Sequence, residues 1–171
     1  MPNYLKLTLS VIICLLAGIG GAVFTQDSLG WYFTLHKPLF RPPNWLFSPV
    51  WIVLYISMGI SFYLIWKKGF SHRDARYAFV IFIVQLILNA SWSIVFFGGR
   101  SIFGGLLVIF ILWLLIFLTI FAFYRINTAA AYILIPYFIW VSYASILNFS
   151  IWRLNWVFSI KALNMKLIYI Y

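Results

Sequence analysis

Acidic side chains are almost absent from the 171-residue chain. It contains no glutamate, and its only carboxylates are those of Asp27 and Asp74, which both lie outside the long apolar runs. A pair of carboxylates within a membrane, which acid–base hydrolysis or a proton relay would use, therefore cannot be formed. This scarcity excludes the conventional hydrolytic enzymes and the proton-coupled pumps that depend on such a pair.

Cysteine and histidine are scarce as well. The single cysteine, Cys14, lies within an apolar run and cannot form an internal disulfide, so the redox compartment stays open. The two histidines, His36 and His72, lie in different connections, which we expect on opposite faces of a membrane. These residues can form neither a metal cluster nor a nucleophile–histidine–acid site. We therefore expect no metal site and no resident cofactor.

Apolar and aromatic residues make up most of the chain. The sequence is 65% hydrophobic and only 8% charged, and a soluble domain of this length cannot bury that much apolar surface. The net charge of +10 comes from lysines and arginines spread among short segments between the apolar runs. This pattern is typical of residues that anchor helix ends at lipid headgroups, and it argues against a nucleic-acid partner.

Five apolar stretches are long enough to cross a bilayer, which requires about 20 helical residues. They cover residues 5–25, 46–66, 77–97, 102–124 and 132–152. We expect an all-α integral membrane bundle of five transmembrane helices, with a long structured first loop and consecutive helices as antiparallel neighbours. The first run resembles a signal peptide, but its length favours a retained span. The basic residues divide evenly between the two faces, so the orientation stays open.

Polar and aromatic side chains recur at helical spacing within three of these spans. Each set occupies one face of its helix. The sets are Trp51, Tyr55 and Met58 in the second span; Gln85, Asn89 and Trp92 in the third; and Trp140, Ala144 and Leu147 in the fifth. A single such stripe is typical of helix packing, with amides that bond between helices. Three stripes together favour an apolar cavity with a few polar groups, as in small-molecule sites.

The first span contains the small residues "AGIGGA", from Ala17 to Ala22. Small residues four positions apart allow close approach of helices. Packing within the chain and a homodimer seam are both compatible with this pattern.

The segment "WYFTLHKPLFRPPNWLFSPVW", Trp31 to Trp51, contains four prolines between two apolar runs. Proline fixes φ and disfavours helix at the preceding residue, so residues 37–48 are predicted to be extended and stiff. Pro49 can lie in the first turn of the second span. The segment could form an interfacial aromatic belt. Its stiffness favours a lid over a pocket, because a belt needs no prolines.

This loop resembles the W-Y-x-x-L-x-K-P-x-x-x-P-P run of the TspO/MBR family, the translocator proteins or peripheral-type benzodiazepine receptors. "LYISMG" (Leu54–Gly59), "LNASWSIVFFG" (Leu88–Gly98) and "PYFIWVSYASILNFSIWRLN" (Pro136–Asn155) continue the resemblance in family order. It covers about residues 5–155. We therefore expect a TspO/MBR membrane domain at residues 1–155 and a C-terminal tail of unknown role at residues 156–171.

The resemblance implies a pocket beneath the first loop for porphyrins and other bulky apolar ligands. Carried over by position, its ligand-binding residues would be Trp31, Tyr32, Pro42, Phe47, Trp51, Tyr55, Asn89, Trp92, Trp140, Ala144 and Leu147. Some bacterial relatives are reported to degrade protoporphyrin in light, which would make Trp51 and Trp140 catalytic. That chemistry would need an electron-rich indole in contact with the excited porphyrin rather than acid–base groups.

Three functions follow from this resemblance. The first is a membrane receptor or sensor for tetrapyrroles, located in a bacterial cell membrane. The second is a light-dependent enzyme that degrades porphyrins. The third is a transporter of porphyrin or lipid. Expected partners are an apolar small molecule, membrane lipid and a second copy of the chain, without nucleic acid.

Overall fold

The computed structural model describes the backbone of residues 1–70 and 72–168 and the side chains of residues 1–70 and 72–158. Within these residues the regular elements are all helical. They are α1 (Asn3–Asp27), α2 (Leu29–Thr34), α3 (Asn44–Lys68), α4 (Arg73–Ser93), the π-helical turn η1 (Ile94–Gly98), α5 (Ile102–Tyr124), α6 (Thr128–Ile133) and α7 (Ile135–Ile168). Five helical stretches are long and apolar enough to cross a membrane. The predicted all-α bundle of five spans is confirmed.

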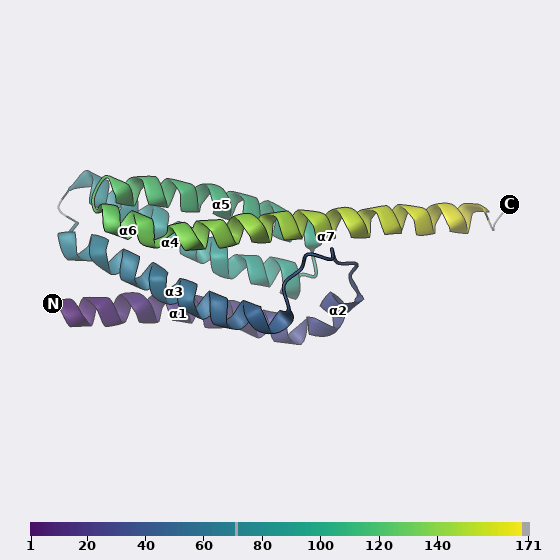
Figure 1. Cartoon of the computed structure of the whole chain (residues 1–171), viewed down its shortest axis with the longest axis horizontal. Helices are drawn as coiled ribbons and strands as arrows, with labels where there is room; N and C mark the ends of the chain where they lie inside the picture. Colours follow the sequence, from purple (N-terminus) through teal and green to yellow (C-terminus); the bar gives the residue numbers. More distant parts are fainter. Residues whose placement is uncertain (71, 169–171) are drawn as a thin grey trace.

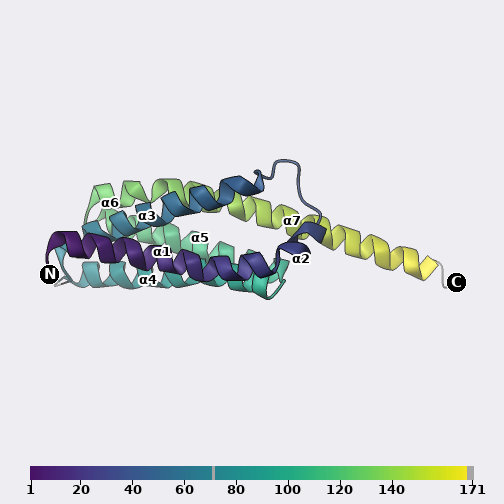
Figure 2. The ribbon, with the colours of Figure 1, turned by 90° about the horizontal axis from the view of Figure 1, so that it is seen from below.

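The five long helices lie roughly side by side (Figure 1). α1 lies between α3 and α4, and α5 lies between α4 and α7. α2 and the α2–α3 loop cover one end of the bundle, where α7 projects beyond the other helices (Figure 2). The described chain therefore begins and ends at opposite ends of the bundle, as five spans require.

The backbones of α3 and α4 are not close neighbours along their length, which differs from the expectation for consecutive helices. α4 packs mainly on α1 and α5 instead. Large rings account for the separation: Phe62 of α3 stacks on Phe82 of α4 with centroids 4.7 Å apart, and Phe82 stacks on Phe123 of α5 at 5.7 Å. These buried rings form the centre of the core.

The first loop is extended over a shorter range than predicted. Residues 36–43 contain no helix, but α3 already begins at Asn44, so the prediction of extended backbone to Ser48 is wrong. Pro49 consequently lies in the second turn of α3 rather than in the first. Proline disfavours helix at the residue before it, and inside a helix it also lacks the N–H that would bond to the carbonyl four residues earlier. Pro49 therefore restricts Ser48 and cannot bond to the Trp45 carbonyl. The packing of Phe47 on Trp140 outweighs both effects.

The small residues of α1 pack within the chain. A Cβ atom on Gly18 would lie 2.3 Å from the ring of Tyr55, and one on Gly21 would lie 3.1 Å from the Ser93 hydroxyl. A Cβ atom on Gly20 would meet no atom within 4 Å. The "AGIGGA" segment therefore brings α1 close to α3 and α4, and the homodimer stays a prediction.

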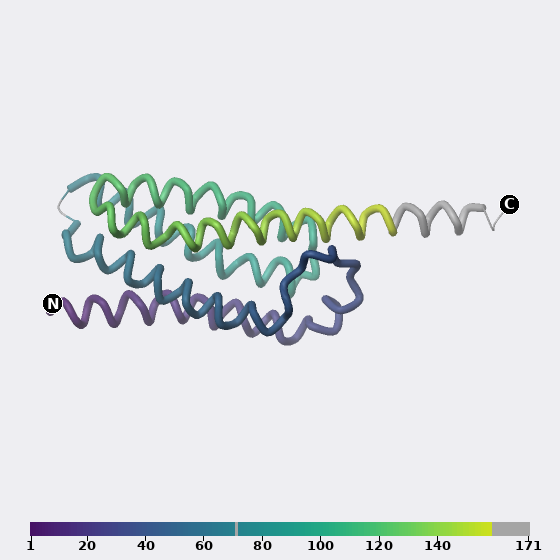
Figure 3. The backbone as a smooth tube through the Cα atoms, viewed as in Figure 1, coloured from purple at the N-terminus to yellow at the C-terminus, as the bar shows by residue number. Residues whose placement is uncertain are grey.

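The backbone passes the predicted domain boundary at residue 155 without a break (Figure 3). Helix α7 continues to Ile168. Residues 169–171 of the predicted tail lie outside the described residues, as do the side chains of residues 159–168. The division of the chain at this point stays a prediction.

Candidate ligand-binding site

The helices α3 and α7 splay apart toward the loop end (Figure 1). Aromatic rings of the two helices meet there. Phe47 meets Trp140 edge to face with centroids 5.9 Å apart, and Trp51 meets Tyr137 in the same way at 6.3 Å. Trp51 also stacks on Tyr55 at 5.5 Å. We call Phe47, Trp51, Tyr137 and Trp140 the α3–α7 seam. The rings present flat apolar faces and little charge.

A line of hydrogen bonds runs beside this seam and joins three helices. The Tyr55 hydroxyl of α3 donates to Oδ1 of Asn89 in α4. Nδ2 of Asn89 donates to the Tyr137 hydroxyl of α7 at 2.9 Å, and that hydroxyl donates to Oε1 of Gln85 at 3.0 Å. Asn89, Tyr137 and Gln85 are all buried. Because unpaired amides are costly in lipid, these bonds hold the three helices in register.

Two buried N–H groups next to this line have no acceptor. They are Nε1 of Trp140 and Nε2 of Gln85. An unpaired buried donor costs about 1–3 kcal/mol. A ligand with a carbonyl or carboxylate oxygen near Trp140 would remove that cost, which gives an otherwise apolar site one directional contact.

A second aromatic group lies between α2 and the end of α4. Trp31 meets Phe96 edge to face at 5.6 Å, and Tyr32 lies 5.7 Å from Phe97. Trp92 stacks on Phe96 at 5.0 Å. Phe96 and Phe97 belong to the π-helical turn η1, and such turns are frequent at functional sites.

Trp92 also connects this second group to α7. With its amide oriented so that both atoms are paired, Asn148 accepts from Nε1 of Trp92 and donates to the Ile102 carbonyl, each at 3.2 Å. Asn148 is 2% exposed. The indole of Trp92 is thus fixed by a hydrogen bond, in contrast to that of Trp140.

The α2–α3 loop is fastened to α7 at two places. The Tyr143 hydroxyl donates to the carbonyl of Phe40 at 2.8 Å. Farther along α7, the amide of Asn155 bonds to both backbone groups of His36, and the His36 ring stacks on Phe158 with centroids 3.8 Å apart. The loop is therefore held against α7 at two places rather than projecting freely from the bundle.

The charges at the loop lie around Tyr32. Nζ of Lys37 is 4.7 Å from the centroid of the Tyr32 ring and donates to the Leu35 carbonyl at 2.8 Å. Burial raises the pKa of the Tyr32 phenol, and Arg41 partly opposes this change. Burial also lowers the pKa of the Lys37 ammonium, and Arg41 adds to that effect. Tyr32 is therefore a neutral hydroxyl at neutral pH.

The structure places the residues proposed from the sequence in these two groups. Phe47, Trp51, Tyr55, Asn89 and Trp140 meet at the seam, whereas Trp31, Tyr32 and Trp92 belong to the second group.

The remaining predicted residues are Ala144, Leu147 and Pro42. Ala144 and Leu147 lie on α7, half-buried and buried respectively, and Pro42 is half-buried in the loop. Contact between a ligand and each of the predicted residues stays a prediction. Sequence reasoning missed Tyr137, although it lies one turn before Trp140 on the same stripe. It also missed Tyr143 and Asn155, because single polar residues carry no periodic signal.

Five apolar helices around an aromatic site define a multi-pass integral membrane protein. The model of the TspO/MBR family matches residues 10–153. The chain is 43% identical to the tryptophan-rich protein TspO of Chlorobaculum tepidum over 152 residues, which cover 88% of this chain and 96% of that protein. The chain belongs to the TspO/MBR family.

More distant relatives include a translocator protein and a protein named for sensing. The translocator protein of Sus scrofa is 35% identical over 147 residues, 82% of this chain and 86% of that protein. The tryptophan-rich sensory protein of Cereibacter sphaeroides is 36% identical over 137 residues, 80% of this chain and 82% of that protein. These matches span nearly the whole five-helix bundle.

Proposed function

We propose that this chain is a membrane receptor or sensor that binds tetrapyrroles, such as protoporphyrin IX and haem-type molecules, and other bulky apolar ligands. The binding site is the α3–α7 seam beneath the α2–α3 loop, and the location is a bacterial cell membrane. Relatives named as a translocator protein and as a sensory protein support such a role. The observation that carries the ligand class is the unpaired indole N–H of Trp140 in a site built from aromatic faces.

A flat, conjugated ligand with a few peripheral oxygens matches this site. Flat rings can stack on Trp51 and Trp140, and burial of one such side-chain face contributes about 1.5–3 kcal/mol. A peripheral carboxylate or carbonyl can accept the Trp140 N–H. The Tyr55 hydroxyl and the Asn89 amide bond to each other, so they fix the Tyr55 ring on which Trp51 stacks.

Entry of such a ligand requires movement of rings that now touch one another. Phe47 and Trp140 are in contact across the seam. We expect the loop to lift from Tyr143 and Asn155 as these rings separate, because both residues tie it to α7. Binding is therefore coupled to loop opening, which is a suitable output for a sensor.

The test is a titration of the full chain in lipid nanodiscs with protoporphyrin IX in darkness, followed by porphyrin fluorescence. We expect saturable binding at one site. Trp140→Phe keeps a ring but removes the N–H, and it should weaken binding about two- to tenfold. Trp45→Phe, which changes an exposed tryptophan, is the matched control and should leave binding unchanged. Absence of saturable binding by the wild type would contradict the proposal.

A second candidate function is light-driven degradation of the bound porphyrin by dioxygen, in which Trp51 or Trp140 gives one electron to the excited porphyrin and dioxygen oxidises the ring. It is favoured by the stacking of Trp51 on Tyr55 and the edge contact with Tyr137, which offer neighbouring phenols to an oxidised indole. Illumination of the complex tests it. Loss of the porphyrin absorption band with the wild type, and its persistence with Trp51→Phe at equal occupancy, would support the enzyme.

A further inference from the structure

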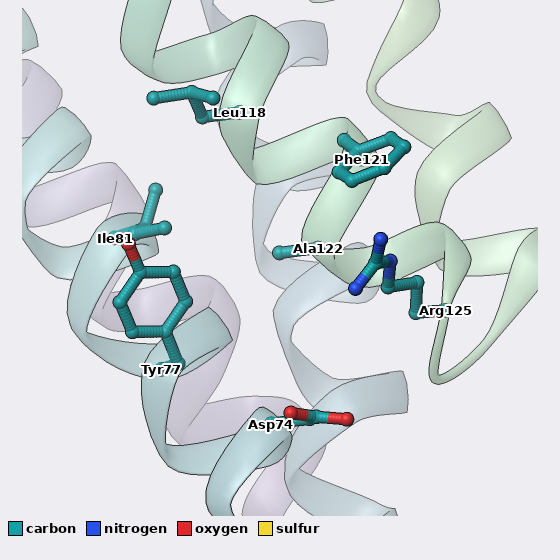
Figure 4. A pocket seen from close by; sticks show the side chains of 7 residues that line it. All are labelled: Asp74, Tyr77, Ile81, Leu118, Phe121, Ala122 and Arg125. Carbon is teal, nitrogen blue, oxygen red and sulfur yellow. The ribbon is translucent and has the colours of Figure 1, made fainter.

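A small hollow opens between α4 and α5 (Figure 4). It lies near the start of α4 and the end of α5, at the end of the bundle opposite the α2–α3 loop (Figure 1). Its volume is about 140 Å³. Its lining includes Asp74, Tyr77 and Ile81 on the α4 side and Leu118, Phe121 and Arg125 on the α5 side. None of these residues belongs to the seam, and the proposed receptor function does not use them.

The hollow has a charged end and an apolar end. Asp74 lies in the first turn of α4, and Arg125 directly follows the last residue of α5, so both are placed where helices leave a membrane. The guanidinium of Arg125 lies over the Phe121 ring, 4.5 Å from its centroid. Figure 4 shows Asp74 and Arg125 at one end, with Ile81 and Leu118 farther along the helices.

We propose that this hollow binds a phospholipid whose headgroup carries a primary amine, as in phosphatidylethanolamine. The phosphate pairs with the Arg125 guanidinium, and the ammonium group pairs with the Asp74 carboxylate. The first part of an acyl chain lies along Ile81 and Leu118. The phosphate and the ammonium group of the headgroup therefore each meet a side chain of opposite charge, in the order in which they follow the acyl chains.

The placement of Asp74 decides between an amine-bearing lipid and an anionic one. This end of the bundle also carries Lys67, Lys68, Arg73 and Arg76, and a wholly basic face would favour an anionic headgroup. Asp74 is one of only two acidic residues in the chain, and it lines the hollow.

A carboxylate in the first turn also stabilises its own helix through the helix dipole. That effect accounts for an acidic side chain at the start of α4. The same effect accounts for Arg125 at the end of α5. It does not account for the hollow that lies between the two charged residues and the apolar side chains of both helices, which the lipid explains.

The experiment is native mass spectrometry of the full chain released from detergent, after incubation with an equimolar mixture of three lipids. The lipids are phosphatidylethanolamine, phosphatidylcholine and phosphatidylglycerol with identical acyl chains. We expect the wild type to retain phosphatidylethanolamine about two- to fivefold more than either competitor. Phosphatidylcholine shares the phosphate but has no N–H to donate to Asp74, so it isolates the contribution of the amine.

Two pairs of variants assign the effect to the hollow. Asp74→Asn should abolish the preference for phosphatidylethanolamine over phosphatidylglycerol, whereas Asp27→Asn, which alters the other acidic residue, should not. Arg125→Gln should lower retention of all three lipids, whereas Arg76→Gln should change it less. Asp74→Glu keeps the charge and should keep the preference. Helix content measured by circular dichroism shows that each variant is folded.

Three results would overturn the proposal. The first is equal retention of the three lipids by the wild type, and the second is preferential retention of phosphatidylglycerol. The third is an unchanged lipid preference in the folded Asp74→Asn variant.

Discussion

The side-chain amide of Asn155 binds both backbone groups of His36. It accepts the His36 N–H at 3.1 Å and donates to the His36 carbonyl at 3.0 Å, although the two residues are 119 positions apart. About three turns earlier on α7, Tyr143 holds the carbonyl of Phe40. One helix therefore carries Trp140 of the seam and also both residues that hold the α2–α3 loop.

Replacement of Asn155 by leucine should release the far end of the loop. It removes the two hydrogen bonds to the loop, each with a net contribution of about 0.5–1.5 kcal/mol, and one to the Ile151 carbonyl of its own helix, while the side-chain volume stays similar. Dissociation of protoporphyrin measured by stopped flow should become at least about fivefold faster. Ser150→Ala is the control, because that hydroxyl bonds only to the Ile146 carbonyl within the same helix. Equal dissociation rates of wild type and Asn155→Leu would show that the amide does not hold a lid.

The prolines of the loop should act through stiffness rather than through contact. Replacement of both Pro42 and Pro43 by glycine enlarges the set of open loop conformations at about 0.4–1 kcal/mol per residue, so apparent affinity should fall by about 1–2 kcal/mol. Trp31 and Tyr32 should also become more accessible to aqueous quenchers. The measurement combines ligand dissociation with quenching of tryptophan fluorescence in the same lipid. If neither changes, the loop is an interfacial aromatic belt and not a lid.

The sequence predicted the fold well because apolar length and composition dominate in a membrane. All five spans were located, and the predicted boundaries differ from those of the first four by up to four residues. The fifth was predicted to end at residue 152, whereas α7 continues to Ile168. The start of α3 was placed too late, since proline rules describe local preference and cannot include the packing of Phe47 on Trp140. The π-helical turn at Ile94–Gly98 carries no periodic signal at all.

The sequence predicted only those residues of the candidate site that recur at helical spacing. Trp51, Tyr55 and Asn89 could be grouped because each repeats on one face of its helix. The fastenings at Tyr143 and Asn155 depend on how a distant loop meets α7, and only the tertiary structure brings those residues together. The same holds for Asp74 and Arg125, which belong to different connections in the sequence.

Gly18→Ala and Gly20→Ala form a matched pair on α1. A methyl group at residue 18 would lie 2.3 Å from the Tyr55 ring, whereas at residue 20 it would meet nothing within 4 Å. Displacement of Tyr55 would break its hydrogen bond to Asn89 and cost about 1–3 kcal/mol of stability. Gly20→Ala should instead be neutral or stabilise the helix by up to about 1 kcal/mol.

Thermal unfolding in detergent separates the two outcomes for this pair. Gly18→Ala should melt at lower temperature than wild type and bind porphyrin more weakly, because Tyr55 is displaced from the site. If both alanine variants melt together, the close approach of α1 to Tyr55 does not contribute to stability.

A large side chain at residue 144 should obstruct the ligand site. Ala144 is half-buried one turn after Trp140, so the ring of Ala144→Phe would project toward the same space. Ile146→Phe, at an exposed position on the same helix, is the control for added bulk. We expect at least about a tenfold loss of porphyrin affinity with Ala144→Phe and none with Ile146→Phe. Normal binding by a folded Ala144→Phe variant would mean that ligand lies away from this face of α7.

The most direct test of the central claim is the dark binding affinity for protoporphyrin IX of Trp51→Ala and Trp140→Ala, with Trp45→Ala as the control. Each seam tryptophan supplies a ring face whose burial contributes about 1.5–3 kcal/mol, so each of the first two variants should bind at least about tenfold more weakly. Trp45 is 72% exposed, and its removal should leave the affinity unchanged. Equal affinities for all three variants and the wild type, with the fold intact, would contradict a ligand site at the α3–α7 seam.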